Sequence, residues 1–144
     1  QDLPQSRLEY SEENLCAKGG YVISDSEGEA EVTLIATGSE VSLAIEAQAL
    51  LNEDGIITKV VSMPSTSHFD NQSSAYKNDV LGERTTKISI EAGSTDGWYK
   101  YVGLDGLTIG MKTFGESAPV GDLFDHFGFT AKKVFTLVKK HVKA

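Results

Sequence analysis

VTLIATGSEVSLAIEAQALL, residues 32–51, combines a buried strand, a tight turn and a helix. The run 32–36 is continuously apolar, as expected of a strand that is covered on both faces of a sheet. Apolar side chains then recur at helical spacing from Val41 to Leu51. Thr37 and Glu40 have the spacing of a capping box, which predicts that their side chains begin the helix. A strand followed directly by a helix in this way is typical of an α/β domain.

The same alternation continues on both sides of this stretch. Further strands are predicted at 21–25, 58–63, 86–92 and 107–111, and helices at 72–81, after Trp98, at 119–128 and from 130 onward. From the residues alone, the strands 21–25 and 32–36 would pair as a hairpin, because only a short turn separates them. The sequence therefore predicts a single α/β domain over 19–144 with a mainly parallel sheet. The polar segment 1–18 is interpreted as a connector from an upstream domain.

Composition and charge disfavour several classes of protein and of binding partner. The chain has 144 residues and a net charge of −8, which disfavours nucleic acid and anionic membranes as partners. No run approaches the ~20 apolar residues of a membrane helix, and the N-terminus lacks the pattern of a signal peptide. Cys16 is the one cysteine, so no disulfide framework is expected. These features predict a cytoplasmic protein.

Two glycine–serine turns follow predicted strands and precede helical segments. They are Gly38-Ser39 and Gly93-Ser94. Such a turn can aim backbone N–H groups at a small anion. A glycine at this place is also what any tight turn between strand and helix requires. The residues leave both interpretations open.

Catalytic signatures are sparse. The three histidines, His68, His126 and His141, are scattered and have no metal-ligand spacing. The hydrolase, P-loop and dinucleotide motifs GxSxG, GxxxxGK[ST] and GxGxxG do not occur. Glu91 ends a predicted strand, where it could act as a base or brace the following loop. The residues alone therefore indicate no strong catalytic or metal-binding candidate.

Four segments in order carry a family resemblance. They are IATGSEVSLAIEA, VVSMPSTSHFDNQSSAY, IEAGSTDGWYKYVGLDG and IGMKTFGESAPVGDLFDHFGFT. Together they resemble the C-terminal domain of transketolase. The resemblance implies a three-layer α/β/α sandwich with a five-stranded mixed, mostly parallel sheet. In that fold the third strand lies between the first two and the first is antiparallel, which replaces the hairpin. The crevice at the carboxyl ends of the strands then lies between the two glycine–serine turns.

The resemblance also implies a function. An intact transketolase, a homodimer, transfers a two-carbon ketol unit between sugar phosphates in the pentose phosphate pathway. It uses thiamine diphosphate and a divalent metal, magnesium or calcium. The family's ligands for both lie in upstream domains, and none maps onto this chain. The family's phosphate-gripping arginine would directly precede Gln1. The isolated chain is therefore expected to be inactive and to bind no thiamine diphosphate, and its partners to be the upstream domains of the same polypeptide.

Three functions compete at this point. The first is a non-catalytic domain that supports its neighbours and the dimer. The second is a regulatory module that binds a small anion or a nucleotide in the crevice. The third is a stand-alone enzyme that uses Glu91, Asp96 or Glu116. The resemblance favours the first.

The loop 113–124 is predicted to be an ordered docking surface for the rest of the enzyme. Its glycine frees the backbone, its proline begins a helix, and its polar side chains can bond nearby N–H groups. The residues that carry this prediction are Gly115, Glu116, Ser117 and Pro119.

Overall fold

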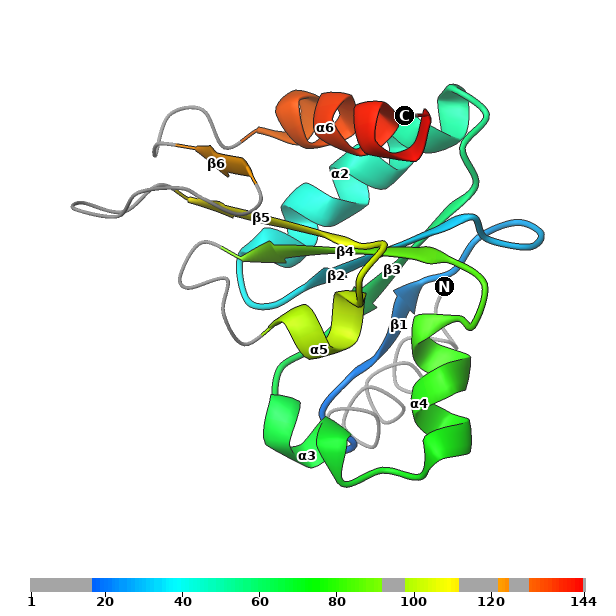
Figure 1. Cartoon of the computed structure of the whole chain (residues 1–144), viewed down its shortest axis with the longest axis vertical. Helices are drawn as coiled ribbons and strands as arrows, with labels where there is room; N and C mark the ends of the chain where they lie inside the picture. The colour runs from blue at the N-terminus through cyan, green and yellow to red at the C-terminus, as the bar shows by residue number, and fades with distance from the viewer. Residues whose placement is uncertain (1–16, 92–97, 112–121, 125–129, 144) are drawn as a thin grey trace, which may run out of the picture.

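The computed structural model describes residues 17–91, 98–111, 122–124 and 130–143 (Figure 1). Its strands are β1 (Tyr21–Ser24), β2 (Val32–Ala36), β3 (Thr58–Ser62), β4 (Thr86–Glu91), β5 (Leu107–Met111) and β6 (Asp122–Phe124). Its helices are α2 (Glu40–Glu53), α3 (Thr66–Asp70), α4 (Ser74–Leu81), α5 (Tyr99–Val102) and α6 (Ala131–Lys143). Among these residues, no helix is long and apolar enough to span a membrane.

The sheet has the strand order β1-β3-β2-β4-β5-β6. Strand β1 is antiparallel to β3, and the other neighbours are parallel. The mixed, mostly parallel sheet implied by the resemblance is therefore confirmed in β1 to β5, and β6 adds three residues at the edge.

The hairpin suggested by the residues alone is wrong, because β1 pairs with β3 and not with β2. Strand β2 is fully buried and has β3 and β4 as its two neighbours. Gln48 of α2 helps to hold β1 in its place. Its amide nitrogen donates to the backbone carbonyls of Ser24 and Thr58, and its amide oxygen accepts from the Ser24 hydroxyl.

The helix predicted at 119–128 is contradicted by β6, which occupies Asp122–Phe124. The backbone of β6 pairs in parallel with β5, with Ile109 opposite Asp122. The apolar spacing of this segment favoured a helix. The backbone groups along the outer edge of β5 also need hydrogen-bond partners, and β6 supplies them. The rest of that segment lies outside the described residues.

Two apolar cores lie on opposite faces of the sheet. Along β2, Leu34 points into one core and Ile35 into the other, as the alternation of a strand requires. Helices α2 and α6 cover the first face, and α3, α4 and α5 cover the second (Figure 1). These layers form the three-layer α/β/α arrangement.

Candidate functional site

A cleft of about 500 Å³ opens at the carboxyl ends of β2, β3 and β4. This is the crevice predicted for the fold, because the chain places β3 and β4 on opposite sides of β2. Its lining residues are Thr37, Met63, Pro64, Thr66, Glu91, Trp98 and Lys100.

The Gly38-Ser39 turn lies beside Thr37, at the start of α2. Gly38 has a φ of +60°, which favours glycine over any residue with a side chain. The turn is closed by its own backbone: the Glu40 N–H donates to the Thr37 carbonyl at 3.2 Å. The Ser39 hydroxyl donates to the Glu40 carboxylate at 3.0 Å.

The predicted capping box is therefore wrong. Helix α2 begins at Glu40 with Ser39 as its N-cap, and no side chain caps it. The left-handed Gly38 presents the carbonyl of Thr37 to Glu40, so the backbone supplies the contact expected from side chains.

Of the two glycine–serine turns predicted to form an anion site, the structure describes only the first. Gly38 and Ser39 directly follow Thr37, which lines the cleft, whereas Gly93 and Ser94 lie outside the described residues. On the described side, the serine hydroxyl and an N–H group are occupied by internal contacts, and the Glu40 carboxylate lies next to them. Binding of an anion here stays a prediction.

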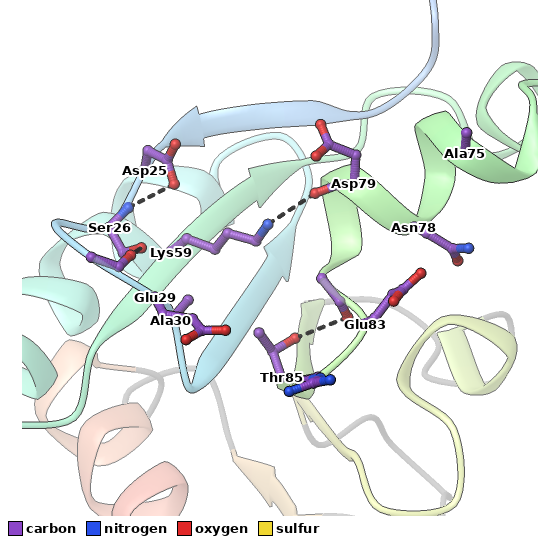
Figure 2. A pocket seen from close by; sticks show the side chains of 13 residues that line it. Asp25, Ser26, Glu29, Ala30, Lys59, Ala75, Asn78, Asp79, Glu83 and Thr85 are labelled. Carbon is purple, nitrogen blue, oxygen red and sulfur yellow. Dashed lines mark hydrogen bonds between the residues drawn. The ribbon is translucent and has the colours of Figure 1, made fainter.

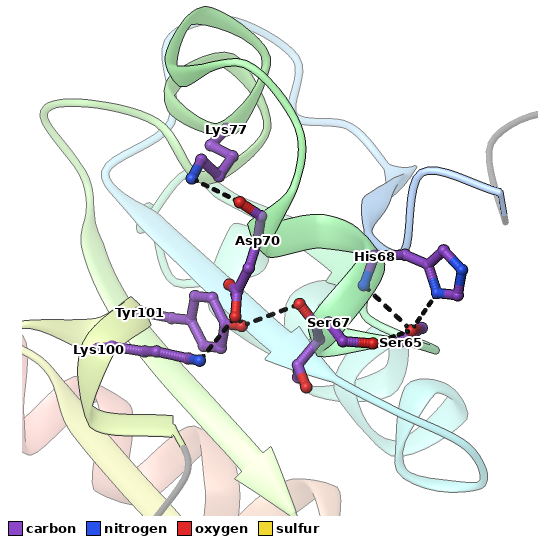
Figure 3. Close-up of polar contacts among 8 residues, drawn as sticks. Ser65, Ser67, His68, Asp70, Lys77, Lys100 and Tyr101 are labelled. Atoms are coloured by element: carbon purple, nitrogen blue, oxygen red, sulfur yellow. Dashed lines mark hydrogen bonds and ion pairs between the residues drawn. The ribbon is translucent and has the colours of Figure 1, made fainter.

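The described cation of the cleft, Lys100, is engaged by Asp70 (Figure 3). Its Nζ donates to Asp70 Oδ2 at 2.7 Å, and the Tyr101 hydroxyl donates to Asp70 Oδ1 at 2.7 Å. The Lys77 Nζ bonds the Asp70 carbonyl at 3.1 Å. These contacts join α3 to α5 and to α4.

These contacts shift the pKa values of Asp70 and Tyr101 in opposite directions. The hydrogen bonds from Lys100 and Tyr101 hold the pKa of Asp70 below its usual value. Burial, together with the Asp70 carboxylate, raises the pKa of Tyr101 well above its usual value. Asp70 therefore stays ionised and Tyr101 stays a donor at neutral pH. No local pattern could predict this pairing, because Asp70 and Tyr101 are far apart in the chain.

Ser65 and His68 form a close pair at the start of α3 (Figure 3). The Ser65 Oγ lies 2.7 Å from His68 Nδ1 and also accepts the His68 backbone N–H. This is the geometry of a helix cap. The Asp70 carboxylate, which could have oriented a catalytic histidine, is bound to Lys100 and Tyr101 instead.

The remaining predicted residues divide into two groups. Glu91 ends β4 and lines the cleft, as expected, and His141 bonds the carbonyl of Asp105 at 2.8 Å. His126, Asp96 and the docking-loop residues Gly115, Glu116, Ser117 and Pro119 lie outside the described residues. Within the described ranges, no group of three or more His, Cys, Asp or Glu side chains could hold a metal ion.

Comparisons with a family model and with curated sequences both identify transketolases as similar proteins. Residues 19–130 match the family model described as the transketolase-like C-terminal domain. The chain is 53% identical over 141 residues to Transketolase 2 of Aliivibrio fischeri, an alignment covering 97% of this chain. It is 50% identical over 138 residues to Transketolase 1 of Escherichia coli, covering 94% of this chain. It spans about a fifth of the length of these curated relatives.

The fold is also similar to a solved structure. The transketolase from Leishmania mexicana superposes with a TM-score of 0.75 at 35% identity. The match covers 90% of this chain and 19% of that protein.

Proposed function

The chain belongs to the transketolase family, whose C-terminal domain it matches, and from this premise we propose that it is that domain of a ketol-transferring enzyme. The intact enzyme would transfer a two-carbon unit between sugar phosphates in the cytoplasm. One observation carries the proposal: about half of the residues are identical to curated transketolases over nearly the whole chain.

We further propose that the domain is non-catalytic and supports its neighbours and the dimer. The described polar groups that resemble catalytic ones have other partners. Ser65 caps α3, His141 bonds a carbonyl, and Asp70 joins two helices. The described residues include no group of side chains that could hold the divalent metal. None of the family's ligands for thiamine diphosphate maps onto this chain, so we assign neither group to it. Both would be held by upstream domains of the same polypeptide, and no step of the reaction is assigned to this chain.

The test compares the 144-residue chain with the intact enzyme that carries it. The purified chain, with thiamine diphosphate and magnesium, should transfer no ketol unit above the rate in buffer, whereas the intact enzyme should. Deleting the domain from the intact enzyme should shift the dimer toward monomer in analytical ultracentrifugation. Ketol transfer by the chain alone would contradict the non-catalytic role. Inactivity of the intact enzyme would contradict the proposed reaction.

The docking role proposed for the loop 113–124 has its own test. Replacing Glu116 by Gln in the intact enzyme should lower its melting temperature or weaken its association more than it changes KM. A large loss of kcat or rise of KM at unchanged melting temperature would assign the loop to the substrate.

A regulatory role is the second candidate, and the cleft of about 500 Å³ favours it. The charges within the cleft oppose tight anion binding, because Lys100 is engaged by Asp70 and Glu91 adds a carboxylate. Micromolar binding of a nucleotide in calorimetry would establish this role in place of a purely structural one.

A further inference from the structure

A second hollow lies at the opposite end of the sheet from the cleft. It is bounded by the turn after β1, the amino-terminal end of β3, helix α4 and the turn that follows α4 (Figure 2). Its volume of about 710 Å³ falls within the range of small-molecule pockets. Its lining residues are Asp25, Ser26, Gly28, Glu29, Ala30, Lys59, Ala75, Asn78, Asp79, Gly82, Glu83, Arg84 and Thr85. We call it the Lys59 pocket.

Lys59 is a buried cation whose donors are only partly used. It is 9% exposed, and its Nζ donates to the backbone carbonyl of Asp79 at 3.1 Å. An ammonium has three N–H donors, and buried charges in proteins are normally paired with an opposite charge. Within the described residues, no carboxylate lies within ion-pair distance of this group. Figure 2 shows the side chain reaching across the hollow toward Asp79.

Two further basic residues, Arg84 and Lys87, belong to the surroundings of Lys59. Arg84 lines the same pocket, and its guanidinium forms no ion pair within the described ranges. Lys87 and Lys59 flank Thr33 in register on neighbouring strands. Burial first, and then the charge of Lys59, lowers the pKa of Lys87. An arginine that lines the same pocket as a buried lysine suits a carboxylate, which can accept two parallel bonds from the guanidinium.

The walls of the pocket also carry negative charge. Asp25, Glu29, Asp79 and Glu83 all line it. None of the four has an ion-pair partner in the described part of the chain. Four carboxylates disfavour a multiply charged anion such as phosphate, and they provide acceptors for a ligand ammonium.

We propose that the Lys59 pocket binds a small zwitterion of the free α-amino acid class. Its carboxylate bonds Lys59 and Arg84, and its ammonium bonds the carboxylates of the acidic walls, Glu83 among them. The pocket is lined largely by charged and polar groups, so a purely apolar ligand would leave them without partners. This site is distinct from the crevice at the carboxyl ends of the strands, with which it shares no lining residue.

The test uses the full 144-residue chain, labelled with ¹⁵N, and four probes. L-alanine carries both charges, propionate lacks the ammonium, ethylammonium lacks the carboxylate, and inorganic phosphate is the competing anion. L-alanine should produce saturable shifts of the amides of Lys59, Glu83 and Arg84. Its Kd should be at least tenfold lower than that of any other probe, because only L-alanine satisfies both sets of charges.

Substitutions at the exposed residues Glu83 and Arg84 should leave the fold intact, so a loss of binding can be separated from unfolding. Arg84→Gln and Glu83→Gln should each weaken L-alanine at least threefold while the spectrum stays dispersed, and Lys132→Gln on the exposed face of α6 should leave binding unchanged. An absence of saturable shifts up to about 20 mM L-alanine would overturn the proposal. Tighter binding of phosphate than of L-alanine would overturn it as well.

Discussion

The Asp70 carboxylate connects two helices through contacts whose contribution to stability depends on pH. Its side chain accepts from Tyr101 and Lys100 and is 38% exposed. Since solvent screens an ion pair with this exposure, its contribution to stability is about 1 kcal/mol or less.

Replacing Asp70 by Asn should lower the free energy of unfolding at pH 7 by about 1 kcal/mol or less. The pKa of Asp70 in the folded chain lies below its ordinary value of 3.8, so the ionised form is the stabilising one. The difference between wild type and variant should therefore be present above pH 3.8 and vanish as the pH falls through the lowered pKa. Urea unfolding at a series of pH values measures it. Asp105→Asn, at an exposed side chain, should show no such trend; a gap that widens toward acid would contradict the assignment.

Two glycines with positive φ should respond differently to alanine. Gly38 has a φ of +60° and open space around a built Cβ, so Gly38→Ala should cost about 1 kcal/mol through backbone strain alone. Gly19 has a φ of +86°, and a Cβ there would lie 2.3 Å from the Ser65 carbonyl oxygen and the Phe69 nitrogen. Gly19→Ala should therefore cost more, about 2 to 4 kcal/mol. Chemical denaturation of both variants decides this, and equal losses would show that close packing at Gly19 is unimportant.

At the scale of elements, α6 is held by its apolar stripe. Val134 and Val138 are fully buried against the sheet core, and the lysines of the helix lie mostly at exposed positions. The sequence predicted a helix from residue 130 onward, because its apolar spacing is a local signal. The Lys133 N–H donates to the Thr130 hydroxyl at 3.3 Å, in agreement with that prediction.

Val138→Ala should lower the free energy of unfolding by about 2 kcal/mol, because it removes two buried carbon atoms and leaves a cavity. Lys140→Ala on the exposed face of the same helix should change it by less than about 0.5 kcal/mol. Thermal or urea unfolding of the two variants makes the comparison. Similar effects of both substitutions would mean that α6 does not pack as described.

At the scale of the whole molecule, the net charge of −8 and the engaged Lys100 argue against tight anion binding. Inorganic phosphate at 1 mM should stabilise the chain by no more than about 0.4 kcal/mol, which corresponds to a Kd of about 1 mM or weaker. Urea unfolding in phosphate and in chloride at matched ionic strength measures the difference. A stabilisation several times larger than this would contradict the prediction and support an anion site in the crevice.

Much of the fold could be predicted from local patterns. The apolar run of β2, the stripe of α2 and the cap of α6 are all encoded within a few residues of one another. The segment around Asp122 was mispredicted because its apolar spacing suits a helix, whereas its pairing with β5 depends on a distant strand. The crevice could be located because the family resemblance supplied the strand order, which the residues alone predicted wrongly for β1.

The sequence by itself determined the class of the domain, the positions of most strands and helices, and the family. These features rest on local spacing and on motifs read in order along the chain. Only the tertiary structure placed β1 beside β3, joined Asp70 to Tyr101, and gathered Lys59, Arg84 and four carboxylates around one pocket. The physical reason is that these contacts join residues far apart in the chain. Their energies depend on burial and on the distances between charges, and neither exists until the sheet has formed.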